Sequence, residues 1–268
     1  MEDKTFSQFH HPTDPDFPFR DLAIADQDVQ DLLTREGIRF GSFDSAKSGL
    51  WLLEREAPTP KEKTITDSVP YQQGVYDFSM LDNQRYFEVR TLTYKFIVFD
   101  GDYRYRSGAE HEIKRKLVPQ GYQNLTDTHM PGYVWRAKCS EVTVEDSADA
   151  STLTATVAFT AYPYAITENE EGADIWDDVN FDHWIFQPVK FTVNGEQEVN
   201  IRNIGSRFIE CAFDLAGTVT LKSDALGTVE LNKDNYKSTQ IVLDIGDNRI
   251  KLSGNGTIAF KFKREEMI

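Results

Sequence analysis

One stretch of this sequence constrains the fold most, because a turn-rich loop leads into a long alternating run. Residues 69–79 hold a proline and a glycine, which mark turns. Residues 86–99 then follow the period of two of a β-strand. One face is expected to carry Phe87, Val89, Thr91, Thr93, Lys95 and Ile97, and the other Glu88, Arg90, Leu92, Tyr94, Phe96 and Val98. Both faces become apolar toward the far half, which favours a strand packed on both sides, at a sheet junction or a subunit contact.

The size and charge of the chain exclude several classes of protein. A length of 268 residues favours two domains, and 40% hydrophobic with 12% aromatic residues is enough for real cores. The net charge is −15, with 44 acidic against 29 basic residues. Binding to nucleic acid requires Lys and Arg clusters that neutralise phosphates, so we expect no sequence-specific nucleic-acid binding.

Targeting signals and cysteines indicate the compartment. No apolar run reaches the length of a membrane span, and the first residues lack a basic region followed by an apolar core. We therefore expect that the chain does not associate with membranes and that it is made in the cytoplasm. Cys139 and Cys211 lie far apart in sequence, which predicts two buried free thiols rather than a disulfide.

The pattern divides the chain into four parts: an N-terminal arm at 1–37, a first domain at 38–165, an acidic connector at 166–187 and a second domain at 188–268. In the arm, prolines break regular structure, and a short helix is expected between Asp26, as its cap, and Gly37. The role of this arm is left open.

The first domain is expected to be mainly β with one clear helix. Short strands are predicted near 40–43 and 50–53, and long strands at 133–144 and 153–162. Residues 54–67 are charged and interrupted by proline, as in an exposed loop or hairpin. Ser107 and Glu110 form a capping-box pattern, which predicts a helix over 108–117.

The second domain is expected to be an antiparallel β-sandwich. Asn194-Gly195 is interpreted as the turn of a first hairpin, and Gly254-Asn255-Gly256 as the turn before the last strand. Further short strands are predicted at 209–213, 219–221, 228–231, 240–243, 249–252 and 257–263. A spacing near ten residues is typical of a sandwich.

No motif for catalysis is present. The five histidines are scattered, neither cysteine has a ligand partner at zinc spacing, and there is no phosphate-binding glycine loop or nucleophile elbow. We predict no catalytic residue, no metal site, no cofactor and no enzyme activity, although a carboxylate pair among 44 acids stays open. The aromatic group Trp176, Phe181, Trp184 and Phe186 is interpreted as an anchor of the second domain, with the lining of a sugar or protein site as the alternative.

Taken together, the order of these pieces resembles the distal tail protein (Dit) family of siphophages that infect Gram-positive bacteria. The resemblance covers residues 38–265. It is carried by Phe40-Gly41-Ser42, Ser48-Gly49-Leu50, residues 69–79, Tyr86, Arg90, Tyr94-Lys95-Phe96, the helix at 108–117 and Ala161-Tyr162-Pro163-Tyr164. In the second domain it is carried by Val193-Asn194-Gly195, residues 201–205, residues 243–250 and Gly254-Asn255-Gly256.

This resemblance implies a β-sandwich or split-barrel-like first domain with one or two helices and a galectin-like second domain. It also implies a structural role in the virion at the tail tip. Six copies would form a hub ring on the tail tube, hold a tail-associated lysin or fibre protein below, and offer docking points for receptor-binding or baseplate proteins. DNA would only pass through this homo-hexamer, and the acidity of the chain suits a lumen that does not hold it.

Two other classes stay open. One is a carbohydrate-binding, lectin-like module, although His183 and Trp184 do not form the residue set of sugar-binding galectins. The other is a different virion part, such as a tail tube or baseplate connector. For the ring, strand 86–99 and loop 54–67 are the predicted contact regions, because β-pairing fixes register between subunits.

Overall fold

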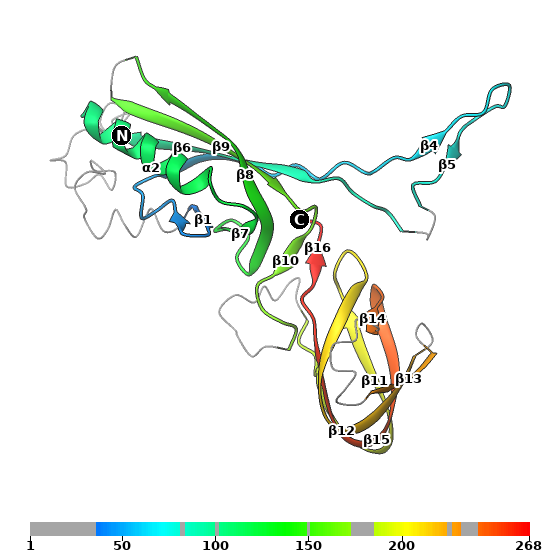
Figure 1. Cartoon of the computed structure of the whole chain (residues 1–268). Coiled ribbons are helices and arrows are strands. Elements are labelled where there is room, and N and C mark those ends of the chain that lie inside the picture. Colours follow the sequence, from blue (N-terminus) through cyan, green and yellow to red (C-terminus); the bar gives the residue numbers. More distant parts are fainter. Residues whose placement is uncertain are drawn as a thin grey trace, which may run out of the picture. The chain divides into compact units, whose positions relative to one another are not determined.

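The computed structural model describes residues 36–80, 84–99, 102–148, 151–172, 185–223, 227–231 and 241–268 (Figure 1). The chain forms two compact units. The first comprises residues 1–131 and 135–163, and the second comprises residues 132–134 and 164–268. The expected N-terminal helix before Gly37 lies outside the described residues.

The first unit is built on an antiparallel sheet with the strand order β2-β1-β7-β8-β9-β6-β3. These strands are β1 (Ile38–Phe40), β2 (Phe43–Asp44), β3 (Trp51–Glu56), β6 (Arg90–Phe99), β7 (Gln123–Asp127), β8 (Tyr133–Asp146) and β9 (Thr152–Ala161). The mainly β fold class is confirmed, and the two long strands predicted at 133–144 and 153–162 are β8 and β9 with ends shifted by one or two residues.

Strand β6 shows the predicted alternation. Arg90, Leu92, Tyr94, Phe96 and Val98 are buried, and Tyr94 stacks edge-on against Phe159 of β9, with ring centroids 6.0 Å apart. The strand was predicted to begin at residue 86, but residues 86–89 are not part of it. Strand β6 also pairs with β9 on one edge and β3 on the other. Both edges of β6 are thus occupied within the chain along residues 93–97, and the contact of this region with a neighbouring subunit stays a prediction.

The helix of the first unit is longer than predicted. Helix α2 spans Tyr103–Leu117, and the Asp102 carboxylate accepts a 2.9 Å hydrogen bond from the Arg104 amide as its N-cap. Ser107 lies inside the helix, so the predicted capping box is wrong. The helix begins before Ser107 because the carboxylate of Asp102 already accepts from a free backbone amide of its first turn. Ile113 and Leu117 are buried on the side of α2 that packs on β9.

The second unit contains fewer and longer strands than predicted. They are β10 (Ala165–Thr167), β11 (Lys190–Asn203), β12 (Ile209–Ser223), β13 (Gly227–Leu231), β14 (Ile241–Leu243), β15 (Gly246–Lys261) and β16 (Glu265–Glu266). The order β11-β15-β12-β13, with β14 beside β12, encloses a core that includes Phe213, Leu221 and Phe260. Strand β10 pairs with β16 and with Tyr133 and Val134 of β8.

Both glycine turns predicted in the second unit are wrong. Asn194-Gly195 lies inside β11 and pairs with Asn255-Gly254 inside β15. Gly217 of β12 lies opposite Gly256. Gly195, Gly217 and Gly254 have positive φ angles of 87°, 90° and 121°. These glycines permit positive φ angles within paired strands, and the strand pairing continues on both sides of each of them.

Both cysteines are free thiols, as predicted; Cys211 is buried and Cys139 is half-buried. Burial raises the pKa of both thiols, to about 12 for Cys211. Among the described residues, no helix is long and apolar enough to cross a membrane.

Candidate interaction surface: a hairpin arm

Residues 57–80 and 84–89, here called the arm, form a long antiparallel hairpin between β3 and β6 (Figure 1). Near its base, the Glu88 amide donates to the Lys61 carbonyl and the Lys63 amide to the Tyr86 carbonyl, both at 2.8 Å. Further out, β4 (Thr66–Asp67) pairs with β5 (Tyr76–Asp77). The proline- and glycine-containing loop that opened the sequence analysis is the tip of this hairpin.

The arm is amphipathic. Paired residues share a face of the hairpin and alternate along each strand, so Ile65, Asp67, Tyr76 and Phe78 share one face, here called the arm face. Ile65, Tyr76 and Phe78 are 59%, 47% and 42% exposed, and the two rings stack with centroids 6.3 Å apart. The opposite face carries polar side chains, namely Thr64, Thr66, Asp77 and Ser79.

Buried polar contacts fix the root of the arm. The Arg90 guanidinium, at the first residue of β6, donates a 2.8 Å hydrogen bond to the carbonyl of Ala57. Burial and the neighbouring Arg55 guanidinium lower the pKa of Arg90. The two chain segments that leave the sheet are therefore tied to each other where the arm begins.

A second buried contact holds β3 at the same root. Arg55 forms an ion pair with Asp127 of β7, whose side chain is fully buried, and the Tyr94 hydroxyl donates to the same carboxylate at 3.0 Å. Burial, together with the Asp127 charge, raises the pKa of Tyr94. These contacts anchor the arm to the sheet, while its outer part has no buried contact of this kind among the described residues.

The open side of the sheet is a second extended surface, and threonine dominates it. Along β9, Thr152, Thr154, Thr156 and Thr160 alternate with buried residues, and their partners include Thr91 and Thr143. Lys95 on this side forms a 3.2 Å ion pair with Glu54. This surface is thus mainly polar, and the charge of Lys95 is balanced by that of Glu54.

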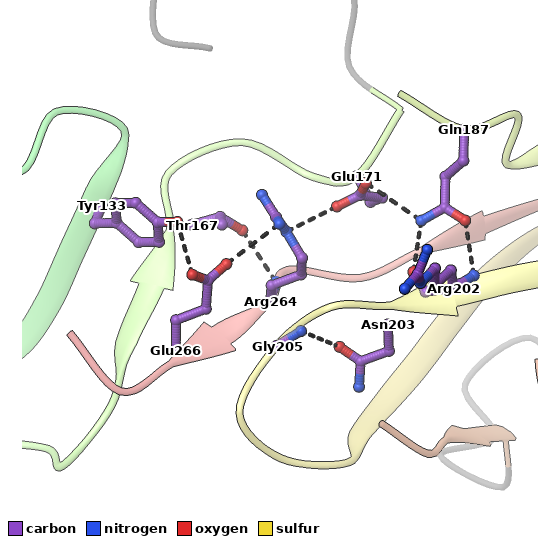
Figure 2. A network of polar contacts seen from close by, with 9 residues as sticks. All are labelled: Tyr133, Thr167, Glu171, Gln187, Arg202, Asn203, Gly205, Arg264 and Glu266. Carbon is purple, nitrogen blue, oxygen red and sulfur yellow. Dashed lines mark hydrogen bonds and ion pairs between the residues drawn. The ribbon is translucent and has the colours of Figure 1, made fainter. Parts of the chain in front are cut away.

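In the second unit, a buried ionic cluster joins β16, the segment that follows β10 and the end of β11 (Figure 2). The Arg264 guanidinium lies 3.0 Å from Glu171 Oε2 and 3.2 Å from Glu266 Oε1, and the side chains of Arg264 and Glu171 are 2% and 6% exposed. The Tyr133 hydroxyl donates to Glu266 at 2.9 Å. Gln187 bridges Glu171 to the backbone of Arg202.

This cluster predicts a specific pH dependence of stability. Burial raises the pKa of Glu171, and the raising outweighs the opposite effects of Arg264 and Gln187. The folded state therefore holds the proton of Glu171 more tightly than the unfolded state does. The contribution of Glu171 to the free energy of unfolding is complete below its unfolded pKa and is lost as pH rises through its folded pKa. Wild type should gain unfolding free energy relative to Glu171→Gln as pH falls from about 7 to about 4.

Urea unfolding of both proteins across this pH range measures that difference. The exposed neighbour Glu168→Gln is the control and should leave the wild-type pH profile unchanged. A difference between wild type and Glu171→Gln that stays flat or shrinks on acidification contradicts the prediction.

The sequence predicted no site residues, and several of its interpretations can be placed. Among the described residues, no group of three potential metal ligands comes together. Phe186 is 72% exposed, so its predicted role as a buried anchor is wrong; Trp176, Phe181, His183 and Trp184 lie outside the described residues. The arm face went unnoticed, although the alternation Thr64-Ile65-Thr66 facing Asp77-Phe78-Ser79 carried the signal.

Comparisons with known proteins give matches in structure alone. No protein-family model and no curated protein matches the sequence. The crystal structure of the SPP1 Dit (gp 19.1) protein matches with a TM-score of 0.60 and 12% identity, covering 85% of this chain and 98% of that chain. That protein is described as a paradigm of the hub adsorption apparatus in phages infecting Gram-positive bacteria.

Two structures of the phage p2 baseplate in its activated conformation, one with Sr and one with Ca, also match. Their TM-scores are both 0.41, with identities of 8% and 9%, covering 85% and 87% of this chain and 98% of each matched chain. The resemblance drawn from the sequence is thus confirmed in the fold: this chain has the fold of the SPP1 Dit protein.

Proposed function

We propose that this chain is the structural subunit of a hub at the distal end of a siphophage tail, where six copies form a ring on the tail tube. The observation that carries the proposal is the match to SPP1 Dit, which covers 85% of this chain and so extends into both of its units. A fold alone does not specify a function, so features of this chain must support the assignment independently.

The arm gives that independent support. A closed ring of identical subunits needs two different complementary surfaces on each copy. The arm offers an extended apolar surface that this chain leaves exposed over its described residues, which is typical of a surface that binds another protein. The hub would hold the tail-associated lysin or fibre protein and dock receptor-binding or baseplate proteins.

The threonine-rich side of the sheet supports passive passage of DNA through the ring. Binding to DNA phosphates depends on unpaired cations, and threonine hydroxyls carry no charge. Lys95 and Lys138 both lie on this side; Lys95 is paired with Glu54, and the Lys138 ammonium lies 5.5 Å from the centre of the Tyr122 ring. Because hydroxyls outnumber cations here, this surface is the proposed channel wall of the ring.

Mass measurement tests the proposal directly. Light scattering of the purified full chain should give about 184 kDa, six times the 30.7 kDa of one copy, and negative-stain images should show rings with a central hole. A chain that stays a monomer at all concentrations contradicts the ring and favours the lectin-like alternative, which a glycan array would then test.

A further inference from the structure

We propose that the arm of one copy docks on the outer side of helix α2 of the next copy. This inference rests on the proposed ring and names the surface that receives the arm. It starts from the arm itself, because an isolated two-stranded hairpin is only marginally stable in water. With Ile65, Tyr76 and Phe78 exposed along one face, the arm has an apolar surface that needs a partner.

The receiving surface is the side of α2 that points away from the core. Arg104, His111 and Arg115 lie at helical spacing on this side, opposite the buried Arg106, Ile113 and Leu117, and Val118 follows just after the helix. We call these four residues the helix face. Val118 is 56% exposed, so this side combines apolar area with positive charge.

The positive charge of the helix face is not neutralised within the helix. Lys114 pairs with Glu110 at 2.6 Å and Lys116 with Glu112 at 2.5 Å, which uses both glutamates of α2. Over the described residues, no ion pair joins Arg104 or Arg115 to a carboxylate. In a chain with a net charge of −15, such a basic surface is unusual and points to an acidic partner.

The arm has the matching charge. Residues 64–80 contain Asp67 and Asp77 and no Lys or Arg, whereas α2 contains five basic and two acidic residues. Asp67 lies on the arm face itself, beside Ile65 and Tyr76. An apolar, acidic hairpin and an apolar, basic helix on the same chain are two different complementary surfaces, which is what a head-to-tail ring of identical copies requires.

Charge reversal followed by mixing tests this contact. Asp67→Lys should repel the helix face, and Arg104→Glu/Arg115→Glu should repel the arm, so each variant alone should lose at least tenfold in the fraction of rings. An equal mixture should form rings again, because alternating copies in an even-membered ring pair each reversed arm with a reversed helix. Light scattering and negative-stain images give the readout.

A matched pair of neutral variants tests the apolar part. Ile65→Ser removes apolar area from the arm face, and its neighbour Thr66→Ser changes the opposite, polar face of the same strand. Ile65→Ser should lower the fraction of rings, and Thr66→Ser should leave it at the wild-type value. Both side chains are exposed, so the thermal unfolding of each variant should match wild type and separate assembly from folding.

The outcomes are distinct. Wild-type rings together with charge variants that still form rings overturn the docking and leave the hub intact. Variants that lose rings but are not rescued by mixing also overturn it, and point to another acidic occupant of the helix face, such as residues 1–35. A wild-type chain that never forms rings overturns the proposed function and, with it, this contact.

Discussion

Arg264→Met is expected to destabilise the protein by about 3–5 kcal/mol, because it removes the cation from a buried cluster and leaves two carboxylates behind. The Arg264 side chain is 2% exposed and lies 3.0 Å from Glu171 and 3.2 Å from Glu266. Methionine keeps most of the length and packing of arginine, so the loss reports the charge. Urea unfolding at about pH 7 measures it.

An exposed ion pair in the same unit provides the control. Lys261 lies 2.5 Å from Asp214, with both side chains nearly half exposed, and Lys261→Met should cost less than about 1 kcal/mol. Adding Glu171→Gln to Arg264→Met should restore part of the loss, because one buried charge is then gone. Equal losses for the Arg264 and Lys261 variants would show that the cluster is not desolvated.

Gly254→Ala is expected to cost about 3 kcal/mol or more, because alanine fits neither the backbone nor the space at this position. Gly254 has a φ angle of 121°, and a Cβ there would lie 2.4 Å from the carbonyl oxygen of Thr218 in the neighbouring strand. That atom belongs to the backbone and cannot move aside without breaking the pairing of β12 with β15. Thermal or urea unfolding gives the measurement.

Its cross-strand partner is the matched control. Gly195 pairs directly with Gly254 and also has a positive φ angle, but a Cβ there would meet no atom within 4 Å. Gly195→Ala should therefore cost only the conformational strain, about 1–2 kcal/mol. If both substitutions cost the same, close packing at Gly254 is not the cause.

These two glycines also show what the sequence could not reveal. A glycine with positive φ is equally suited to a hairpin turn and to an irregular position within a long strand. The local sequence Asn194-Gly195 is the same in both cases, and the choice depends on the distant partner Gly254. The alternation in 90–99 and 152–161, by contrast, was sufficient to identify β6 and β9, because each strand buries one whole face.

The candidate surfaces divide in the same way. The arm face was readable in principle, because its alternation is local. The ion pair of Arg55 with Asp127 at the root of the arm could not be predicted, since the two residues lie 72 positions apart along the chain. The cluster of Arg264 with Glu171 joins two residues separated by a whole unit of strands. Sequence alone offered 44 acidic residues as partners, and only the fold selects among them.

The pairing of β10 with β16 has a consequence for engineering. Ala165 pairs with Glu266 and Ile166 with Glu265, so the chain enters and leaves the second unit side by side. A tag or reporter fused after Ile268 would emerge next to the entrance of this unit, and its linker would start there rather than at the far loops of the strands. Residues 164–268 could be exchanged as one continuous segment if the new unit keeps the pairing of its first strand with Tyr133 and Val134 of β8.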